Sequence, residues 1–120
     1  MPKGRLFLVD GDNHVNEGLS GVMNTRKQDT VQVFVTQDGL SDRLKKKYGD
    51  RIRVTKVRPG NQAVDNVIKS RIGQEASKSD HSELYVLSHD KGYAGQLEKA
   101  HKKGKKKYRQ AHSIKQAISK

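Results

Sequence analysis

The sequence predicts a compact, doubly wound α/β domain, with a mostly parallel sheet of four to five strands and helices on both faces. Three observations support this fold class. Short apolar segments end in turn residues, amphipathic segments of helical period lie between them, and 120 residues is the length of one domain. Strands that alternate with helices are joined by right-handed crossovers, which makes neighbouring strands parallel. We therefore expect residues 1–120 to form a single domain.

The strands are predicted from apolar segments of four to six residues that are rich in β-branched or aromatic side chains. Four segments have this composition: Leu6–Val9, Val31–Val35, Ile52–Val57 and Leu84–Leu87. The third alternates with period 2, whereas the other three are nearly continuous, as in central strands covered on both faces. A fifth strand, at an edge of the sheet, is predicted over Lys105–Arg109.

The helices are predicted from capping residues and from the spacing of apolar side chains. Asn61 can cap a helix that starts at Gln62. Apolar side chains then follow at i, i+3, i+4 and i+8, which places them on one face; they are Val64, Val67, Ile68 and Ile72. Further helices are expected over 92–103 and 113–119, with less regular ones over 14–27 and 39–47.

Charge is concentrated in two basic zones within a chain of net charge +12. Residues 43–58 hold eight Lys or Arg and one acid, and residues 98–120 hold nine and one, so the remainder is mildly acidic. Such a balance points to a polyanion, most often nucleic acid, although an acidic membrane surface or simply solvated faces remain alternatives. The predicted phosphate contacts are Lys45, Lys46, Lys47, Arg51, Arg53 and Arg58 in the first zone and Lys102, Lys103, Lys105, Lys106, Lys107 and Arg109 in the second.

Several classes of protein are excluded or disfavoured. There is no cysteine, which excludes disulfides and thiolate metal sites. No apolar stretch approaches the ~20 residues that span a bilayer, and no signal-peptide pattern opens the chain, so we expect a cytoplasmic protein without membrane association. No Walker motif is present, and no nucleophile elbow accompanies Ser88.

Three aspartates stand where parallel α/β domains place their chemistry. Asp10 ends the first predicted strand, Asp90 follows the fourth, and Asp65 lies in the first turn of the helix after the third. In the strand order 3-2-1-4-5, strands one and four are neighbours at the switch point, where ligands bind. Carboxylates that lie close together repel one another unless a cation neutralises them, and their oxygen atoms suit a hard cation such as Mg²⁺ or Mn²⁺. Such an ion can activate water and stabilise charge on a phosphodiester.

Nearby polar residues complete this predicted site, and each also has a structural alternative. Asp12 is a further candidate metal ligand, Asn13 a supporting residue, and Ser88 a residue that orients Asp90. A single aspartate after a strand is often only a turn residue or a helix cap. His14 and His89 are candidate general bases or ligands, or surface histidines. Tyr93 is a candidate for stacking on a base, or for packing beneath the strand end.

Three sequence blocks resemble a known family. Leu6–Asn13 (LFLVDGDN) is similar to the opening strand and turn of NYN and related PIN-like domains. Arg58–Gly73 (RPGNQAVDNVIKSRIG) resembles the Gly-Asn-Ala-Leu-Asp segment of the bacterial PIN-like group. Tyr85–Leu97 (YVLSHDKGYAGQL) resembles that group's S-x-D-x-G-F/Y motif. The three blocks also occur in the family's order and at its spacing.

This resemblance implies a ribonuclease that uses Mg²⁺ or Mn²⁺, with Asp10, Asp65 and Asp90 as metal ligands and Asn13 in support. Gly92 and Ala94 stand where relatives often carry a further acid, for which Asp12 is a candidate replacement. The alternatives are a non-catalytic RNA-binding module of the same fold, and a nuclease toxin or defence effector controlled by a partner protein. A homodimer is a further alternative for the assembly of this protein. A phosphoacceptor of receiver type is disfavoured, because Arg58 ends the third strand.

Overall fold

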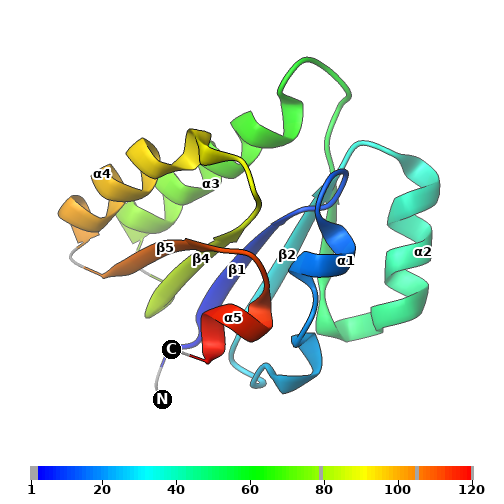
Figure 1. The fold of residues 1–120 in the computed structure, drawn as a ribbon, viewed down its shortest axis with the longest axis horizontal. Helices are drawn as coiled ribbons and strands as arrows, with labels where there is room; N and C mark the ends of the chain where they lie inside the picture. Colours follow the sequence, from blue (N-terminus) through cyan, green and yellow to red (C-terminus); the bar gives the residue numbers. More distant parts are fainter. Residues whose placement is uncertain (1–2, 79, 105, 120) are drawn as a thin grey trace.

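The computed structural model describes residues 3–78, 80–104 and 106–119, and these residues form a five-stranded parallel sheet (Figure 1). The strands lie in the order β3-β2-β1-β4-β5. Their bounds are Arg5–Asp10 (β1), Thr30–Val35 (β2), Arg53–Lys56 (β3), Glu83–Leu87 (β4) and Lys107–Ala111 (β5). Every neighbouring pair is parallel. The predicted fold class and strand order are therefore confirmed.

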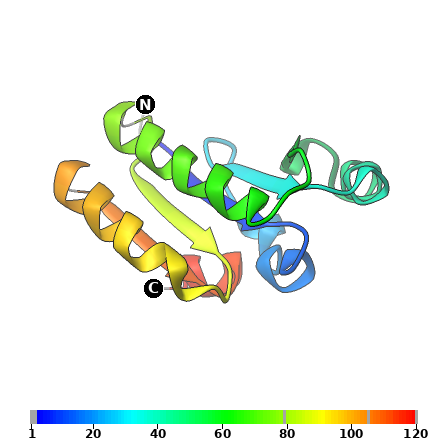
Figure 2. The ribbon, with the colours of Figure 1, turned by 90° about the horizontal axis from the view of Figure 1, so that it is seen from above.

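Helices cover both faces of this sheet. They are α1 (Val15–Gly18), α2 (Asp38–Tyr48), α3 (Ala63–Lys78), α4 (Ala94–Gly104) and α5 (Ile114–Ile118). Short 3-10 turns occur over Val22–Asn24, Gly49–Arg51 and Lys91–Tyr93. Seen from above, α3 and α4 run side by side over one face (Figure 2), while α1, α2 and α5 contribute to the core of the other.

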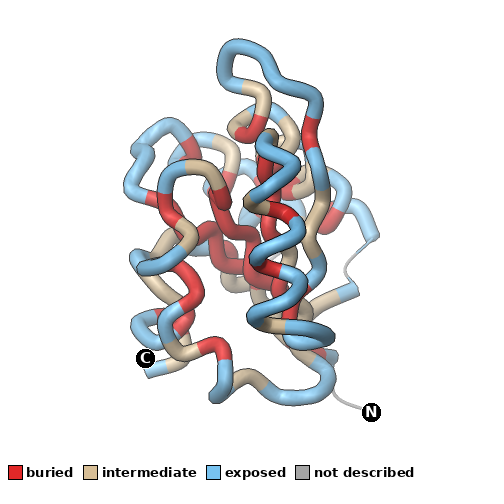
Figure 3. The backbone as a smooth tube through the Cα atoms, turned by 90° about the vertical axis from the view of Figure 1, so that its right-hand side faces the viewer, coloured by how far each residue is buried: buried red, intermediate tan, exposed pale blue. Residues whose placement is uncertain are grey.

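The alternation of side chains along the strands produces two cores. Leu6 and Leu8 of β1 pack with α3 and α4, whereas Phe7 and Val9 face the opposite core. Most residues of both cores are buried, and the buried segments gather in the interior of the molecule in Figure 3. Burial on both faces explains why β1, β2 and β4 are nearly continuous apolar runs rather than alternating ones.

The start of α3 differs from the prediction. The helix begins at Ala63 rather than Gln62, because Gln62 has φ +56°, a left-handed conformation that a right-handed helix does not accept. Asn61 therefore does not directly precede the helix, and its predicted capping role is wrong. The predicted apolar face is confirmed: Val64, Ile68 and Ile72 are buried against the sheet.

Two other predicted elements also differ in extent. The helix expected over 14–27 is reduced to the four residues of α1 and a 3-10 turn, because Gly18 ends α1 and Gly21 has φ +92°. The edge strand expected over Lys105–Arg109 is observed as β5 at Lys107–Ala111, and Lys105 itself lies outside the described residues. Its position at the edge of the sheet is as predicted.

The parallel arrangement brings the carboxyl ends of β1, β4 and β5 and the start of α3 to one edge, which we call the carboxyl edge. Gly11 allows the tight exit from β1: its amide donates to the Phe34 carbonyl at 2.9 Å, and a Cβ at this position would lie only 2.7 Å from that oxygen. No helix in the described part of the chain is long and apolar enough to cross a membrane.

Candidate active site

The carboxyl edge gathers the three predicted aspartates around one hollow of about 180 Å³. Asp10 reaches it from the end of β1, Asp90 from the loop after β4, and Asp65 from the first turn of α3. The remaining lining residues are Asn13, His14, Ser88 and His89. Residues 80 positions apart in the sequence therefore share one polar cavity.

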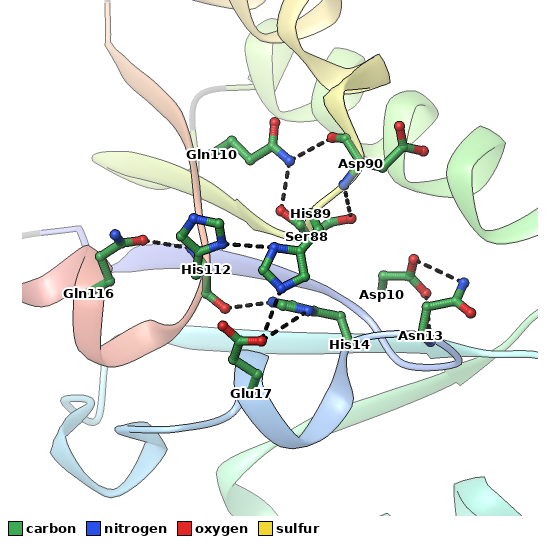
Figure 4. Close-up of polar contacts among 10 residues, drawn as sticks. All are labelled: Asp10, Asn13, His14, Glu17, Ser88, His89, Asp90, Gln110, His112 and Gln116. Carbon is green, nitrogen blue, oxygen red and sulfur yellow. Dashed lines mark hydrogen bonds and ion pairs between the residues drawn. The ribbon is translucent and has the colours of Figure 1, made fainter.

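Asp10 is the most enclosed of the three acids, with 4% of its surface exposed. The backbone amide and the side-chain amide of Asn13 each donate to its carboxylate at 3.4 Å (Figure 4). These contacts are long, so Asn13 holds the orientation of Asp10 without satisfying all of its lone pairs. The structure thus places Asn13 in contact with Asp10, while its predicted role in support of a metal ligand stays a prediction.

Asp65 carries a raised pKa. Burial is the largest cause of this increase, and the negative charges of Asp90 and Asp10 add to it. The Tyr93 hydroxyl has the opposite effect on the pKa, because it donates to Asp65 at 2.6 Å and favours the ionised form. Tyr93 is completely buried, so its packing beneath the strand end is confirmed and it is not available for stacking on a base. Three neighbouring acids thus crowd one site.

Asp90 has the opposite shift, although it faces the same cavity. Its pKa is lowered, first by the Gly92 amide that donates to its carboxylate at 2.8 Å and then by a hydrogen bond with Asp65. Asp65 and Asp90 thus lie close enough for each to shift the pKa of the other.

The loop that carries Asp90 is held by two polar side chains. The buried Ser88 hydroxyl accepts from the Asp90 backbone amide at 3.0 Å. Gln110 of β5 donates to the carbonyls of Ser88 and Asp90 at 2.7 and 2.6 Å. Figure 4 shows both contacts side by side. Ser88 therefore acts on the backbone of Asp90 rather than on its carboxylate.

Asp12 has a separate local partner. Its two carboxylate oxygens accept from the Thr36 amide at 3.0 Å and from the Thr36 hydroxyl at 2.6 Å, which ties the β1 loop to the end of β2. Asp12 lines a neighbouring hollow of about 410 Å³, which it shares with Asp65 and Asn13 but not with Asp10 or Asp90. Its predicted role as a metal ligand is untested by this geometry.

A second polar cluster borders the carboxylates. His14, Glu17 and His89 each offer one ligand atom, and these atoms lie within 4.8 Å of one another. In the described part of the chain no other trio of His, Asp or Glu meets this spacing, so the three aspartates are less tightly gathered. His14 is buried rather than a surface histidine, whereas His89 is exposed.

Most of the predicted phosphate contacts lie away from the carboxylates. Helices that follow parallel strands run back to the amino ends of those strands. The last turns of α2 and α4, which carry Lys45–Lys47 and Lys102–Lys103, are therefore remote from the carboxyl edge (Figure 1). The start of β5, with Lys106 and Lys107, lies at that far edge as well.

Arg58 is the predicted base nearest the carboxyl edge, because it lies two residues after the end of β3 and is exposed. Lys69, which was not among the residues predicted from the sequence, also lies close. Its ammonium group stands 5.9 Å from the centre of the Tyr93 ring and helps to lower the pKa of Asp90. Lys69 follows Asp65 by four residues on a predicted helix, so this spacing could have indicated it. Glu17, Gln110 and His112 gave no comparable signal.

The donor set fits a divalent cation at the three aspartates. The three carboxylates and the Asn13 amide offer oxygen ligands, which Mg²⁺ and Mn²⁺ prefer, and such ions commonly use one or two carboxylates with several waters. Burial raises the pKa of Asp65, and the negative charges of Asp90 and Asp10 raise it further. A bound cation would relieve this repulsion, and the pair of Asp65 and Asp90 together with Asp10 would hold it.

Comparisons with known proteins add the following. No curated protein matches the sequence. A solved structure named SsCR_L211H matches at 17% identity and a TM-score of 0.43, over 72% of this chain and 24% of that chain. A short chain dehydrogenase/reductase of Saccharomyces cerevisiae, YIR035C, matches at 20% identity and a TM-score of 0.45, over 71% and 34%. The chain thus spans about a third or less of these proteins.

The family comparison covers far more of the sequence. A model of the PIN domain matches residues 4–110, which include all five strands except the last residue of β5. The match also spans the three blocks whose resemblance to PIN-like domains was seen in the sequence. This chain belongs to the PIN domain family.

Proposed function

We propose that this protein is a metal-dependent ribonuclease that hydrolyses RNA phosphodiesters, with Mg²⁺ or Mn²⁺ held by Asp10, Asp65 and Asp90. PIN domains are generally metal-dependent nucleases. The observation that carries the proposal is the convergence of Asp10, Asp65 and Asp90 on one hollow at the carboxyl edge. Burial, together with the charges of Asp90 and Asp10, raises the pKa of Asp65 there. Excess negative charge in a polar hollow is what a bound divalent cation neutralises.

The residues around the acids would prepare the site for this reaction. When bound, the ion would supply activation of water and neutralisation of charge on the scissile phosphate. Tyr93 holds Asp65, Asn13 holds Asp10, and Ser88 with Gln110 fixes the loop of Asp90. Such fixed neighbours orient the carboxylates without a cost of reorganisation during the reaction.

The proposed substrate contacts follow from the positions of the bases. Lys69 and Arg58, at the carboxyl edge, would contact phosphates beside the cleaved bond. The two basic zones, whose described lysines lie mostly at the far edge, would add electrostatic affinity with little sequence preference. We place this activity in the cytoplasm, with RNA as the partner.

Cleavage of labelled single-stranded and hairpin RNA tests the proposal. The wild type should cut with Mn²⁺ or Mg²⁺ and not with EDTA. Asp10→Asn and Asp90→Asn should each abolish cutting while the proteins still fold and bind RNA. Asp42→Asn is the matched control, because Asp42 is an exposed aspartate of α2 outside the carboxyl edge, and it should cut like the wild type.

An inactive wild type would reverse the proposal. If no metal supports cutting, and tight salt-sensitive RNA binding is unchanged in both aspartate variants, the protein is a non-catalytic RNA-binding module. Gly92 is the feature that favours this second function. It stands where related domains often carry a further acid, and here only its backbone amide contacts Asp90. Cutting that persists in both variants would place the active site elsewhere.

A further inference from the structure

We propose a second metal site, for a transition metal of the Zn²⁺ class, formed by His14, Glu17 and His89. These residues offer two imidazole nitrogens and one carboxylate oxygen, all within 4.8 Å of one another. Imidazole ligands suit Zn²⁺ and its neighbours in the first transition row, whereas Mg²⁺ prefers oxygen alone. The site is thus chemically distinct from the three aspartates and stands whether or not the protein cleaves RNA.

The hydrogen bond of His14 fixes which nitrogen is free to bind. His14 Nε2 lies 2.6 Å from the backbone carbonyl of His112, and a carbonyl can only accept, so Nε2 carries a hydrogen. In the neutral ring, Nδ1 then has a free lone pair. This atom faces Glu17 Oε2 at 3.8 Å. Two acceptors that face each other across such a gap are stabilised by a cation between them.

His89 has the complementary arrangement. Its Nε2 lies 3.0 Å from the same Glu17 oxygen, and its Nδ1 lies 2.9 Å from Nδ1 of His112 (Figure 4). If a metal replaces the hydrogen at Nε2, the hydrogen on Nδ1 can donate to His112. Both histidines would then have the outer hydrogen bond that orients metal-ligating imidazoles, one to a carbonyl and one to a ring nitrogen.

The three ligands come from two segments of the carboxyl edge, and a third segment supplies His112, which contacts both histidines. Glu17 lies in α1, His89 in the loop after β4, and His112 in the turn between β5 and α5. The side chains of Glu17 and His89 are 55% and 56% exposed, so water and metal can reach them, whereas His14 is almost fully enclosed. Three protein ligands with an open side correspond to Zn²⁺ sites that keep a position for water or substrate.

The test uses purified protein without a histidine tag and Co²⁺ as a spectroscopic replacement for Zn²⁺. We expect one Co²⁺ per chain with visible absorption bands that indicate nitrogen ligation, displaced by Zn²⁺ but not by excess Mg²⁺. Zn²⁺ should also raise the midpoint of thermal unfolding. Glu17→Gln and His89→Asn are suitable variants because both side chains are exposed, so the fold should survive.

Five variants separate the second metal site from the rest of the protein. Glu17→Gln and His89→Asn should abolish the absorption bands. His112→Ala retains the carbonyl that holds His14 but loses the ring contact with His89, so affinity should fall by roughly 10-fold to 100-fold. His101→Asn, which alters an exposed histidine of α4, and Asp90→Asn, which alters the carboxylate site, should both retain the bands.

Three results would overturn the second site. The first is no Co²⁺ binding with the metal in large excess. The second is binding of unchanged affinity in Glu17→Gln and His89→Asn, and the third is an equal loss in His101→Asn. None of these measurements depends on RNA, so failure here would leave the proposed ribonuclease untouched. Loss of the bands in Asp90→Asn alone would instead assign the bound metal to the carboxylate site.

Discussion

At the scale of single residues, the carboxyl edge depends on side chains that hold the aspartates in place. Tyr93 is the clearest example, because its ring is fully buried while its hydroxyl reaches Asp65 at 2.6 Å. Burial and the bond with Asp65 also raise the pKa of Tyr93, so the phenol stays protonated and remains a donor. A buried donor with a single acidic partner contributes to stability and to orientation at once.

Tyr93→Phe should lower the free energy of unfolding by about 1–3 kcal/mol, because it removes a hydrogen bond to an acidic group and leaves that group partly unsatisfied. The measurement is urea unfolding of the metal-free protein at neutral pH. Tyr48→Phe is the matched control, since Tyr48 is only half buried on α2, and its effect should stay within about 0.5 kcal/mol. Equal losses in the two variants would contradict a specific role for the Tyr93 hydroxyl.

At the scale of elements, α3 is fixed at both ends by different interactions. Near its start and middle, apolar side chains pack on the sheet. Near its end, the fully buried Glu75 accepts from the amide of His81 at 2.7 Å, from the His81 ring at 3.0 Å and from Arg71 at 3.3 Å. The His81 ring also contacts the Thr30 hydroxyl at 3.2 Å, which links α3 to β2.

Ile68→Ala tests the packing of α3. Ile68 is completely buried between the helix and the sheet, so the substitution should cost about 2–5 kcal/mol through lost burial and the cavity left behind. Chemical unfolding measures the cost. Asn66→Ala, on the exposed face of the same helix, should change stability by less than about 0.5 kcal/mol. A small effect of Ile68→Ala would show that α3 does not pack as described.

Glu75 should make stability depend on pH. Burial opposes its ionisation, but the donors of His81 and Arg71 outweigh burial and lower its pKa below the ordinary 4.5. A carboxylate with a lowered pKa contributes stability that is complete above the unfolded pKa and lost as the pH falls through the folded value. Unfolding of the wild type should therefore become easier below about pH 5.

The comparison is with Glu75→Gln, measured by urea unfolding across the same acidic range. This variant should be less stable than the wild type at neutral pH by about 1–3 kcal/mol, because a neutral amide replaces a buried charged acceptor. The difference should shrink as the pH falls, since the wild type then also loses its carboxylate. A constant difference would mean that the Glu75 pKa is not lowered.

At the scale of the whole molecule, acids and bases are segregated. The protein measures 38 × 32 × 22 Å, and its three aspartates lie at one edge of the sheet. The lysine-rich last turns of α2 and α4 lie towards the opposite edge of the sheet, and the two helices are on opposite sides of the molecule (Figure 1). In the proposed function, the net charge of +12 would attract RNA from a distance, while the local acidic site would accept a phosphate only with a bound cation.

This separation predicts that binding and cleavage can be altered independently. Replacing Lys45, Lys46 and Lys47 together by alanine should weaken RNA binding and reduce the slope of log affinity against log salt by up to about 2 for single strands. The cleavage rate at saturating RNA should not change, because these side chains are remote from the aspartates. Lys69→Ala should instead lower that rate. An unchanged salt slope would exclude α2 as an RNA contact.

Much of the fold followed from local sequence patterns. Four strands were located from runs such as Leu6–Val9, and the apolar face of α3 was located from the spacing of Val64, Ile68 and Ile72. These signals depend on burial of neighbouring residues in one element, which sequence records directly. Placing Asp10 and Asp90 after adjacent strands also needed only the strand order that right-handed crossovers favour.

The sequence by itself determined the parallel α/β class, the strand positions and the presence of acids at strand ends. Only the tertiary structure decided which side chains meet: Tyr93 with Asp65, and His14 with the carbonyl of His112, 98 positions away. It also placed the lysine-rich turns far from the aspartates and shortened α1. The physical reason is that strand and helix propensities are local, whereas side-chain contacts depend on strand order, crossover geometry and rotamers across the whole chain.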